Sequence, residues 1–178
     1  DSVSFDGITT AKGNYDVSGS APVELAWSCI GQYTDQINPC RFMTFMGAIA
    51  GGGKAAQPHI VSEVYFEGEI TYQAEPVYTN RIMSEEVASI LRDYLRNNVI
   101  TVYGDSNFPG LKVCAKSGTS QLGGGQTSNA MFTGFIDDEE LPLAFIVCIE
   151  DGGYGRKVAI PVISEVLETC LDLKDKLV

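Results

Sequence analysis

The chain contains 178 residues, of which 44% are hydrophobic, and its formal net charge at pH 7 is −11. This length and apolar content are sufficient for one domain, or a large part of one, with a substantial core. The negative charge argues against a nucleic-acid partner and against an anionic membrane surface, because like charges repel and no basic cluster reverses the sign locally.

The five cysteines are widely spaced, and the single histidine leaves too few ligands for a zinc site. We therefore expect no metal and no cofactor. Most of the cysteines lie in apolar runs, which favours buried free thiols that act as small hydrophobic residues. No segment reaches the roughly 20 apolar residues that span a bilayer. Any export signal or membrane anchor is therefore expected to lie outside this chain.

The first 21 residues are rich in Gly, Ser, Asp and Thr, which is typical of a loop-like segment with at most a short strand. We expect this segment to need neighbouring elements to order it. A short helix is predicted within residues 21–32, and Trp27 is its expected packing anchor.

The next helix is better marked. Asn38 is a good N-cap, Pro39 suits the first turn of a helix, and the glycines from Gly51 onward end it. Residues 57–72 then alternate between apolar and polar types around the turn at 67–68, which predicts a small peripheral hairpin.

A second amphipathic helix is predicted after Ser84, which is a suitable N-cap. Its apolar residues recur with helical spacing, which predicts core packing for that face, whereas Arg92 and Arg96 are expected to face water. The residues of the expected core face are Val87, Ile90, Leu91, Tyr94 and Leu95.

Three strands follow, at about 111–120, 130–137 and 141–150. A glycine-rich link at 123–125 joins the first two and an acidic turn at 137–140 joins the last two, so an antiparallel meander is the economical topology. The third strand is apolar on both faces and is expected to be central or covered.

A last helix is predicted from about 157 to 177, with Pro161 tolerable only in its first turn. It should pack across the sheet. The fold class predicted from these elements is therefore α+β, with an antiparallel sheet of three consecutive C-terminal strands packed against helices.

The end of the first of these strands carries the most informative residues, Lys116-Ser117-Gly118-Thr119-Ser120. An ammonium, several hydroxyls and a glycine at a strand end indicate an anion site, because the glycine lets a ligand lie against the backbone while the other groups hold a carboxylate. From these residues alone, an ordinary strand-end lysine that reaches solvent is the simpler interpretation.

The order of several short stretches, together with this strand, resembles the C-terminal half of the transpeptidase domain of penicillin-binding proteins. The stretches are Ile-Gly-Gln at 30–32, a Pro-led helix at 38–43, Ala-Gly-Gly-Gly at 50–53, Pro-His-Ile-Val at 58–61, Phe-Thr-Gly-Phe at 132–135 and Gly-Arg-Lys-Val-Ala-Ile-Pro at 155–161. Asn38, Gly51 and Met131 stand where the family usually has Thr, Asn and Trp.

The resemblance implies a β-lactamase-like fold and serine-type D,D-transpeptidase activity on peptidoglycan stem peptides, with β-lactam antibiotics as inhibitors, in an extracytoplasmic, membrane-anchored protein. It implies catalytic roles for Lys116 and Thr119, whose backbone N–H would serve an oxyanion hole. It also implies substrate binding by Ser117, Gly118, Thr119 and Ser120.

The family's Ser-x-x-Lys and Ser-x-Asn motifs are absent from the sequence. The nearest substitute, Thr9-Thr10-Ala11-Lys12, lies in a loop-like segment and is a poor nucleophile candidate. We therefore expect residues 1–178 to be the C-terminal portion of one domain, inactive alone, whose partner is the N-terminal half that carries the nucleophile. A non-catalytic relative that binds peptidoglycan or a protein partner, and a β-lactam sensor, remain open alternatives.

Overall fold

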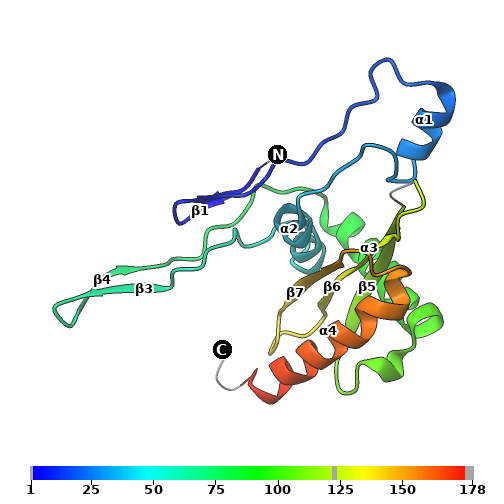
Figure 1. The fold of residues 1–178 in the computed structure, drawn as a ribbon. Helices are drawn as coiled ribbons and strands as arrows, with labels where there is room; N and C mark the ends of the chain where they lie inside the picture. Colours follow the sequence, from blue (N-terminus) through cyan, green and yellow to red (C-terminus); the bar gives the residue numbers. More distant parts are fainter. Residues whose placement is uncertain (1, 122–123, 175–178) are drawn as a thin grey trace.

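The computed structural model describes residues 2–121 and 124–174. Its centre is an antiparallel sheet of strands β5 (Val113–Ser120), β6 (Asn129–Ile136) and β7 (Ala144–Ile149), in the order β5-β6-β7 (Figure 1). This confirms the predicted meander and the α+β class. Part of the predicted glycine-rich link, residue 123, lies outside the described residues.

Helix α4 (Gly155–Asp172) covers one face of the sheet. It begins before the predicted start, so Pro161 lies inside the helix and the expectation that it sits in the first turn is wrong. A proline there removes one backbone hydrogen bond. The helix continues because its apolar stripe is buried against the sheet, and such packing outweighs local propensity. The predicted end, at 177, lies outside the described residues. The stripe comprises Ala159, Ile160, Ile163 and Leu167.

Helix α2 (Pro39–Ala50) lies on the opposite face. The Asn38 side chain accepts a hydrogen bond from the backbone N–H of Arg41 at 3.0 Å, and the helix ends at Gly51, as predicted. Met46 and Ile49 pack against Cys114 of β5 and Phe135 of β6. The two faces of the sheet are therefore each covered by helix, with a separate apolar cluster on each side.

Helix α3 (Glu85–Asn98) also packs on the α2 side, next to β5. Its buried face is displaced from the predicted one. Ala88 is fully buried and Leu91 and Leu95 are partly buried, whereas Val87, Ile90 and Tyr94 of the expected core face are exposed. The residue of α3 that is buried completely is therefore a small one, and three of the larger apolar side chains face solvent.

The two arginines of α3, expected to face water, instead tie the helix to the sheet. Arg92 donates to the backbone O of Ala50 at 2.6 Å, and its Nε lies 3.4 Å from a carboxylate oxygen of Asp137. Arg96 donates to both carboxylate oxygens of Asp105 at 2.6 and 2.8 Å and to the backbone O of Val113 at 3.1 Å. These hydrogen bonds from Arg96 lower the pKa of Asp105.

The first part of the chain extends away from this body (Figure 1). It contains the short strands β1 (Ser4–Phe5) and β2 (Ile8–Thr9), helix α1 (Pro22–Ser28), and the hairpin β3 (Glu63–Phe66) and β4 (Glu69–Gln73). The predicted loop, short helix and hairpin are confirmed. Trp27 is 44% exposed, so its expected role as a packing anchor is wrong within the described structure.

Strand β7 is an edge strand of the described sheet and is covered by α2 on one face and α4 on the other, so of the two predicted placements, central or covered, it has the second. It pairs with β6, and its Cys148 is exposed although it lies in an apolar run. Cys29 is exposed as well, and only Cys114 of the five free thiols is fully buried, which corrects the expectation of mainly buried cysteines. Among the described residues, no helix is both long and apolar enough to cross a bilayer.

Candidate active site

The last five residues of β5 present their side chains on two faces. Because side chains alternate along a strand, Ser117 and Thr119 share the α4 face, and Lys116, Gly118 and Ser120 share the face of α2 and α3. Lys116 and Ser120 are exposed, and the three residues between them are half-buried. The strand end is therefore accessible while its backbone is fixed by pairing with β6.

Gln32 holds the outer edge of β5, the edge that faces away from β6. Its side-chain Nε2 donates to the backbone O of Thr119 at 2.9 Å, and its Oε1 accepts from the backbone N–H of Gln121 at 3.1 Å. The side-chain amide thus makes one donor and one acceptor contact with the backbone of residues 119 and 121, as the backbone of a neighbouring strand would. This contact joins the segment after α1 to the predicted anion site.

Ser117 is held at the same edge by a residue from a different element. The backbone N–H of Ser117 donates to the hydroxyl oxygen of Tyr103 at 2.9 Å, and the two hydroxyl oxygens lie 3.1 Å apart. Lys116 donates from Nζ to the backbone O of Ser117 at 2.7 Å. Lys116 therefore returns to its own strand in this arrangement, with its exposed ammonium at the backbone carbonyl of Ser117.

The backbone N–H of Thr119 points to the outer edge, because the N–H and C=O of one strand residue face the same side and the C=O is bound by Gln32. No hydrogen bond within the described part of the chain occupies this N–H. The hydroxyl oxygen of Thr119 accepts from the backbone N–H of Gly155 at 3.2 Å, which leaves its own O–H free to donate.

Two glycines at this site serve different purposes. A Cβ added at Gly155 would lie 2.1 Å from the backbone O of Gly118, so α4 can begin this close to β5 only with a glycine. A Cβ at Gly118 would lie 3.4 Å from the Cβ of Met131, which is close to ordinary contact. Packing within the chain therefore requires a glycine at 155 but not at 118.

The arrangement gathers donors and positive charge at one strand end. The groups are the ammonium of Lys116, the hydroxyls of Ser117 and Thr119, and the N–H of Thr119. Such a set can bind a carboxylate and a developing oxyanion. Ser120, at the end of β5, adds a further exposed hydroxyl.

Sequence reasoning assigned no role in the site to Tyr103, Gln32 or Gly155. Gln32 and Gly155 lay in stretches that carried the family resemblance, so a signal existed for both. Tyr103 ends an apolar run 13 residues before Lys116 and carried no local signal. Its role depends on the path of the chain between α3 and β5.

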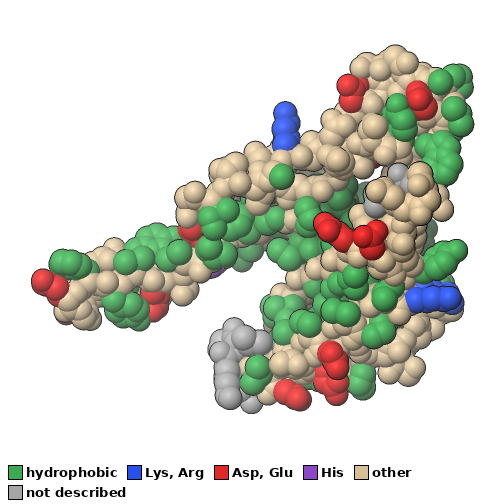
Figure 2. Space-filling view, viewed as in Figure 1, with side chains coloured by type: hydrophobic (Ala, Val, Ile, Leu, Met, Phe, Trp, Pro, Cys, Tyr) green, Lys and Arg blue, Asp and Glu red, His purple; other side chains and the backbone are tan. Residues whose placement is uncertain are grey.

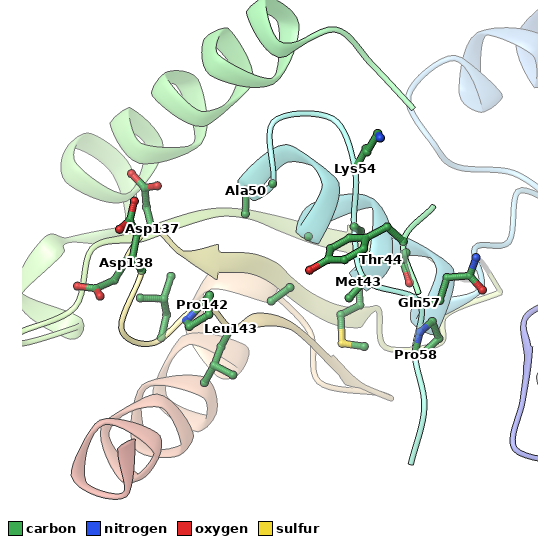
Figure 3. Close-up of a pocket in the computed structure, with 18 of the residues that line it drawn as sticks. Met43, Thr44, Ala50, Lys54, Gln57, Pro58, Asp137, Asp138, Pro142 and Leu143 are labelled. Carbon is green, nitrogen blue, oxygen red and sulfur yellow. The ribbon is translucent and has the colours of Figure 1, made fainter. Parts of the chain in front are cut away.

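The chain also contains a cavity of about 690 Å³, at the other end of the sheet (Figure 3). It lies between α2, the base of the β3–β4 hairpin and the turn after β6, where Asp137 and Asp138 are placed. Asp137 is bound there by Lys112 at 2.6 Å and by Arg92. Lys112 just precedes β5, so this cavity is about 20 Å along the strand from Thr119 and separate from the candidate site.

Neither Cys114 of β5 nor Cys148 of β7 is an activated nucleophile. Burial, reinforced by the charge of Asp137, raises the pKa of the Cys114 thiol to about 11, so it stays protonated at neutral pH. Partial burial also raises the pKa of the Cys148 thiol. Thr9, which was considered as a nucleophile, lies in β2 without the helix that would bring Lys12 to its hydroxyl.

Comparisons with known proteins show the family and the fold of the chain. Residues 6–168 match the family model of the penicillin-binding protein transpeptidase domain. The fold is similar to penicillin-binding protein A of Mycobacterium tuberculosis, with a TM-score of 0.79, 20% identity, and coverage of 90% of this chain and 40% of that chain. It is also similar to the D,D-transpeptidase domain of a peptidoglycan glycosyltransferase from Eggerthella lenta, with a TM-score of 0.79, 24% identity, and coverage of 97% and 44%.

A third similar structure is the penicillin G acyl-enzyme of the same Mycobacterium tuberculosis protein, with a TM-score of 0.76, 20% identity, and coverage of 90% and 38%. No curated protein matches the chain. The chain thus spans less than half the length of these solved relatives. With its family match extending over most of its residues, the chain belongs to the penicillin-binding protein transpeptidase domain family.

Proposed function

We propose that this chain supplies the C-terminal part of the active site of a serine-type D,D-transpeptidase that cross-links peptidoglycan. The observation that supports it best is the outer edge of β5, where Thr119 keeps an unoccupied, outward N–H within the described structure. The Ser117 hydroxyl and the Lys116 ammonium lie on neighbouring residues of the same strand.

The proposed reaction is acyl transfer in two steps. A serine supplied by a part of the domain outside this chain attacks the carbonyl carbon of a D-alanyl-D-alanine stem peptide, and the C–N bond to the last D-alanine breaks as that amine takes a proton. The resulting ester then reacts with an amine of a neighbouring stem peptide, which releases the serine. A β-lactam would stop at the first ester.

Each group at the strand end has a role in this scheme. The N–H of Thr119 stabilises the oxyanion of the tetrahedral intermediate, an interaction whose loss typically costs about 10²–10³ in rate. Ser117 and Thr119 bind the terminal carboxylate through their hydroxyls, and Lys116 provides the compensating positive charge. Gly118 leaves space for the substrate backbone, since packing against Met131 does not itself require a glycine there.

The sequence contains neither Ser-x-x-Lys nor Ser-x-Asn, so we propose that the 178-residue chain alone does not acylate. Its partner would be the N-terminal half of the same domain. The exposed apolar hairpin and helix α1, both in the first part of the chain, are compatible with further contacts to such a partner (Figure 2). Family membership further supports an extracytoplasmic location, with a membrane anchor outside this chain.

The test is the intact mass of two proteins after incubation with penicillin G. One is the 178-residue chain, and the other is a longer chain that adds the sequence encoded upstream of Asp1. We expect no adduct on the first and one adduct per molecule on the second. An adduct on the first chain would refute its proposed incompleteness.

The same experiment separates the alternatives. Absence of an adduct on the longer chain would favour a non-catalytic relative that binds peptidoglycan or a protein. A stable adduct without release of D-alanine from a stem peptide would favour a β-lactam sensor.

A further inference from the structure

We infer that Tyr103 is a positioning residue that makes the Ser117 hydroxyl a hydrogen-bond donor toward a bound carboxylate. The hydroxyl oxygen of Tyr103 lies 2.9 Å from the backbone N of Ser117 and 3.1 Å from its Oγ. One phenol therefore contacts both the backbone N–H and the hydroxyl of the residue to which the proposed function assigns carboxylate binding. The inference rests on that proposed function only for the class of ligand.

The position of the Tyr103 hydroxyl is fixed by its surroundings. Tyr103 is the last residue of η1 (Val99–Tyr103), a π-helical turn that continues α3, and such turns are frequent at functional sites. Its side chain is only 9% exposed, and its ring meets the ring of Phe132 edge to face at 5.2 Å. Gly104 follows with a φ of +88°, which lets the chain turn away directly after it.

The number of protons determines the direction of the hydrogen bonds. The Tyr103 oxygen accepts the backbone N–H of Ser117, and its single proton is free to donate. A carboxylate has no proton of its own, so it must accept the O–H of Ser117. In the contact between the two hydroxyls, Tyr103 then donates to Ser117 Oγ. The hydrogen bonds therefore run in series from the phenol through Ser117 to the ligand.

This series of hydrogen bonds affects which ligands the site favours. A hydroxyl that accepts one hydrogen bond is a better donor of the next, so Tyr103 strengthens the bond from Ser117 to an anion. The Lys116 ammonium donates to the Ser117 carbonyl, which adds positive charge at the same residue. The ligand favoured by this geometry is a carboxylate over the corresponding neutral amide.

A purely structural role for Tyr103 makes a different prediction. If the phenol only satisfies the backbone N–H of Ser117, its removal loosens the strand and weakens every ligand to the same degree. The ratio of affinities for an acid and its amide therefore separates the two roles.

The experiment uses the ¹⁵N-labelled 178-residue chain and two probes, N-acetyl-D-alanine and N-acetyl-D-alaninamide, with binding followed at the amide resonances of Ser117 and Thr119. We expect Tyr103→Phe, which keeps the ring, to reduce the acid-to-amide affinity ratio about fivefold, as the loss of one hydrogen bond would. The matched control is Tyr94→Phe, which removes a hydroxyl from an exposed tyrosine of α3 and should not change the ratio.

Ser117→Ala provides the second arm. In this variant the ratio should already be low, and adding Tyr103→Phe should not lower it further. An unchanged acid-to-amide affinity ratio in Tyr103→Phe would overturn the inference. If that variant fails to fold, an unchanged ratio in Ser117→Ala would overturn it. A wild-type chain that binds neither probe would overturn it as well. Because reversible binding is measured, these outcomes do not depend on acylation, the readout of the proposed function.

Discussion

The central sheet and the β3–β4 hairpin are both rich in apolar side chains, but they differ in how these side chains are covered. Phe132 and Phe135 of β6 are fully buried. Phe66 and Tyr65 of the hairpin are 65% and 61% exposed, and Figure 2 shows apolar side chains along this extended region. Apolar content alone does not create a core, because a sheet face must also have a second layer against it.

Helices supply that layer for the sheet, with α4 on one face and α2 and α3 on the other. The hairpin has no helix over it within the described residues. The chain also spans only 40% of the length of the Mycobacterium tuberculosis relative. We therefore expect the sheet region to carry most of the stability of this chain and the hairpin to carry little.

Two phenylalanine substitutions, one in the sheet and one in the hairpin, test this comparison. They are expected to give the largest difference in the free energy of unfolding. Phe132→Ala should lower the free energy of unfolding by about 4 kcal/mol, because it opens a cavity among packed aromatic rings. Phe66→Ala should change it by less than about 0.5 kcal/mol. Urea unfolding of both variants measures the difference, and equal losses would show that the hairpin is as well packed as the sheet.

The two glycines of the site give the next largest effect. Gly155→Ala should cost about 3 kcal/mol, since its Cβ would lie 2.1 Å from the Gly118 carbonyl oxygen, whereas Gly118→Ala should be close to neutral for folding. Thermal unfolding compares the two. If Gly118→Ala destabilised the fold as much as Gly155→Ala, its glycine would be needed for packing and not for a ligand.

Thiol labelling compares the segment after α1, which contains Cys29, with the central sheet, which contains Cys114, and needs no mutation. At pH 8, exposed Cys29 should react about a hundredfold faster than Cys114, whose pKa of about 11 keeps the thiolate scarce and whose side chain is buried. Cys148, exposed but with a raised pKa, should fall between them. Mass spectrometry of maleimide-treated protein gives the order. Labelling of Cys114 as fast as Cys29 would indicate that the sheet opens on the same timescale.

The smallest effect concerns the ion pair that joins α3 to the turn before β5. Because Arg96 lowers the pKa of Asp105 in the folded state, the pair stabilises the protein above the unfolded pKa of about 4, and the contribution is lost as pH falls below it. Asp105→Asn should cost about 0.5 kcal/mol at pH 7, as for other partly exposed pairs, and less at pH 2. Urea unfolding at both pH values measures this, and an equal loss at both would assign the effect to packing.

Local sequence signals determined the elements of this protein well. The cap at Asn38, the stop at Gly51 and the turn residues of the hairpin each act through backbone groups a few positions away, so they can be recognised without the rest of the fold. The strand that ends in Lys116–Ser120 was recognised in the same way. The roles of its residues in catalysis and substrate binding remain predictions.

Only the tertiary structure decided which faces are buried and which distant residues meet the strand end. Helix α3 buries Ala88 completely and leaves Val87, Ile90 and Tyr94 exposed, and β7 pairs with β6 alone in the described sheet. Gln32 and Tyr103 reach β5 from 87 and 14 positions away in the sequence. Contacts of this kind follow from how the elements pack together, and no local pattern of residues specifies that packing.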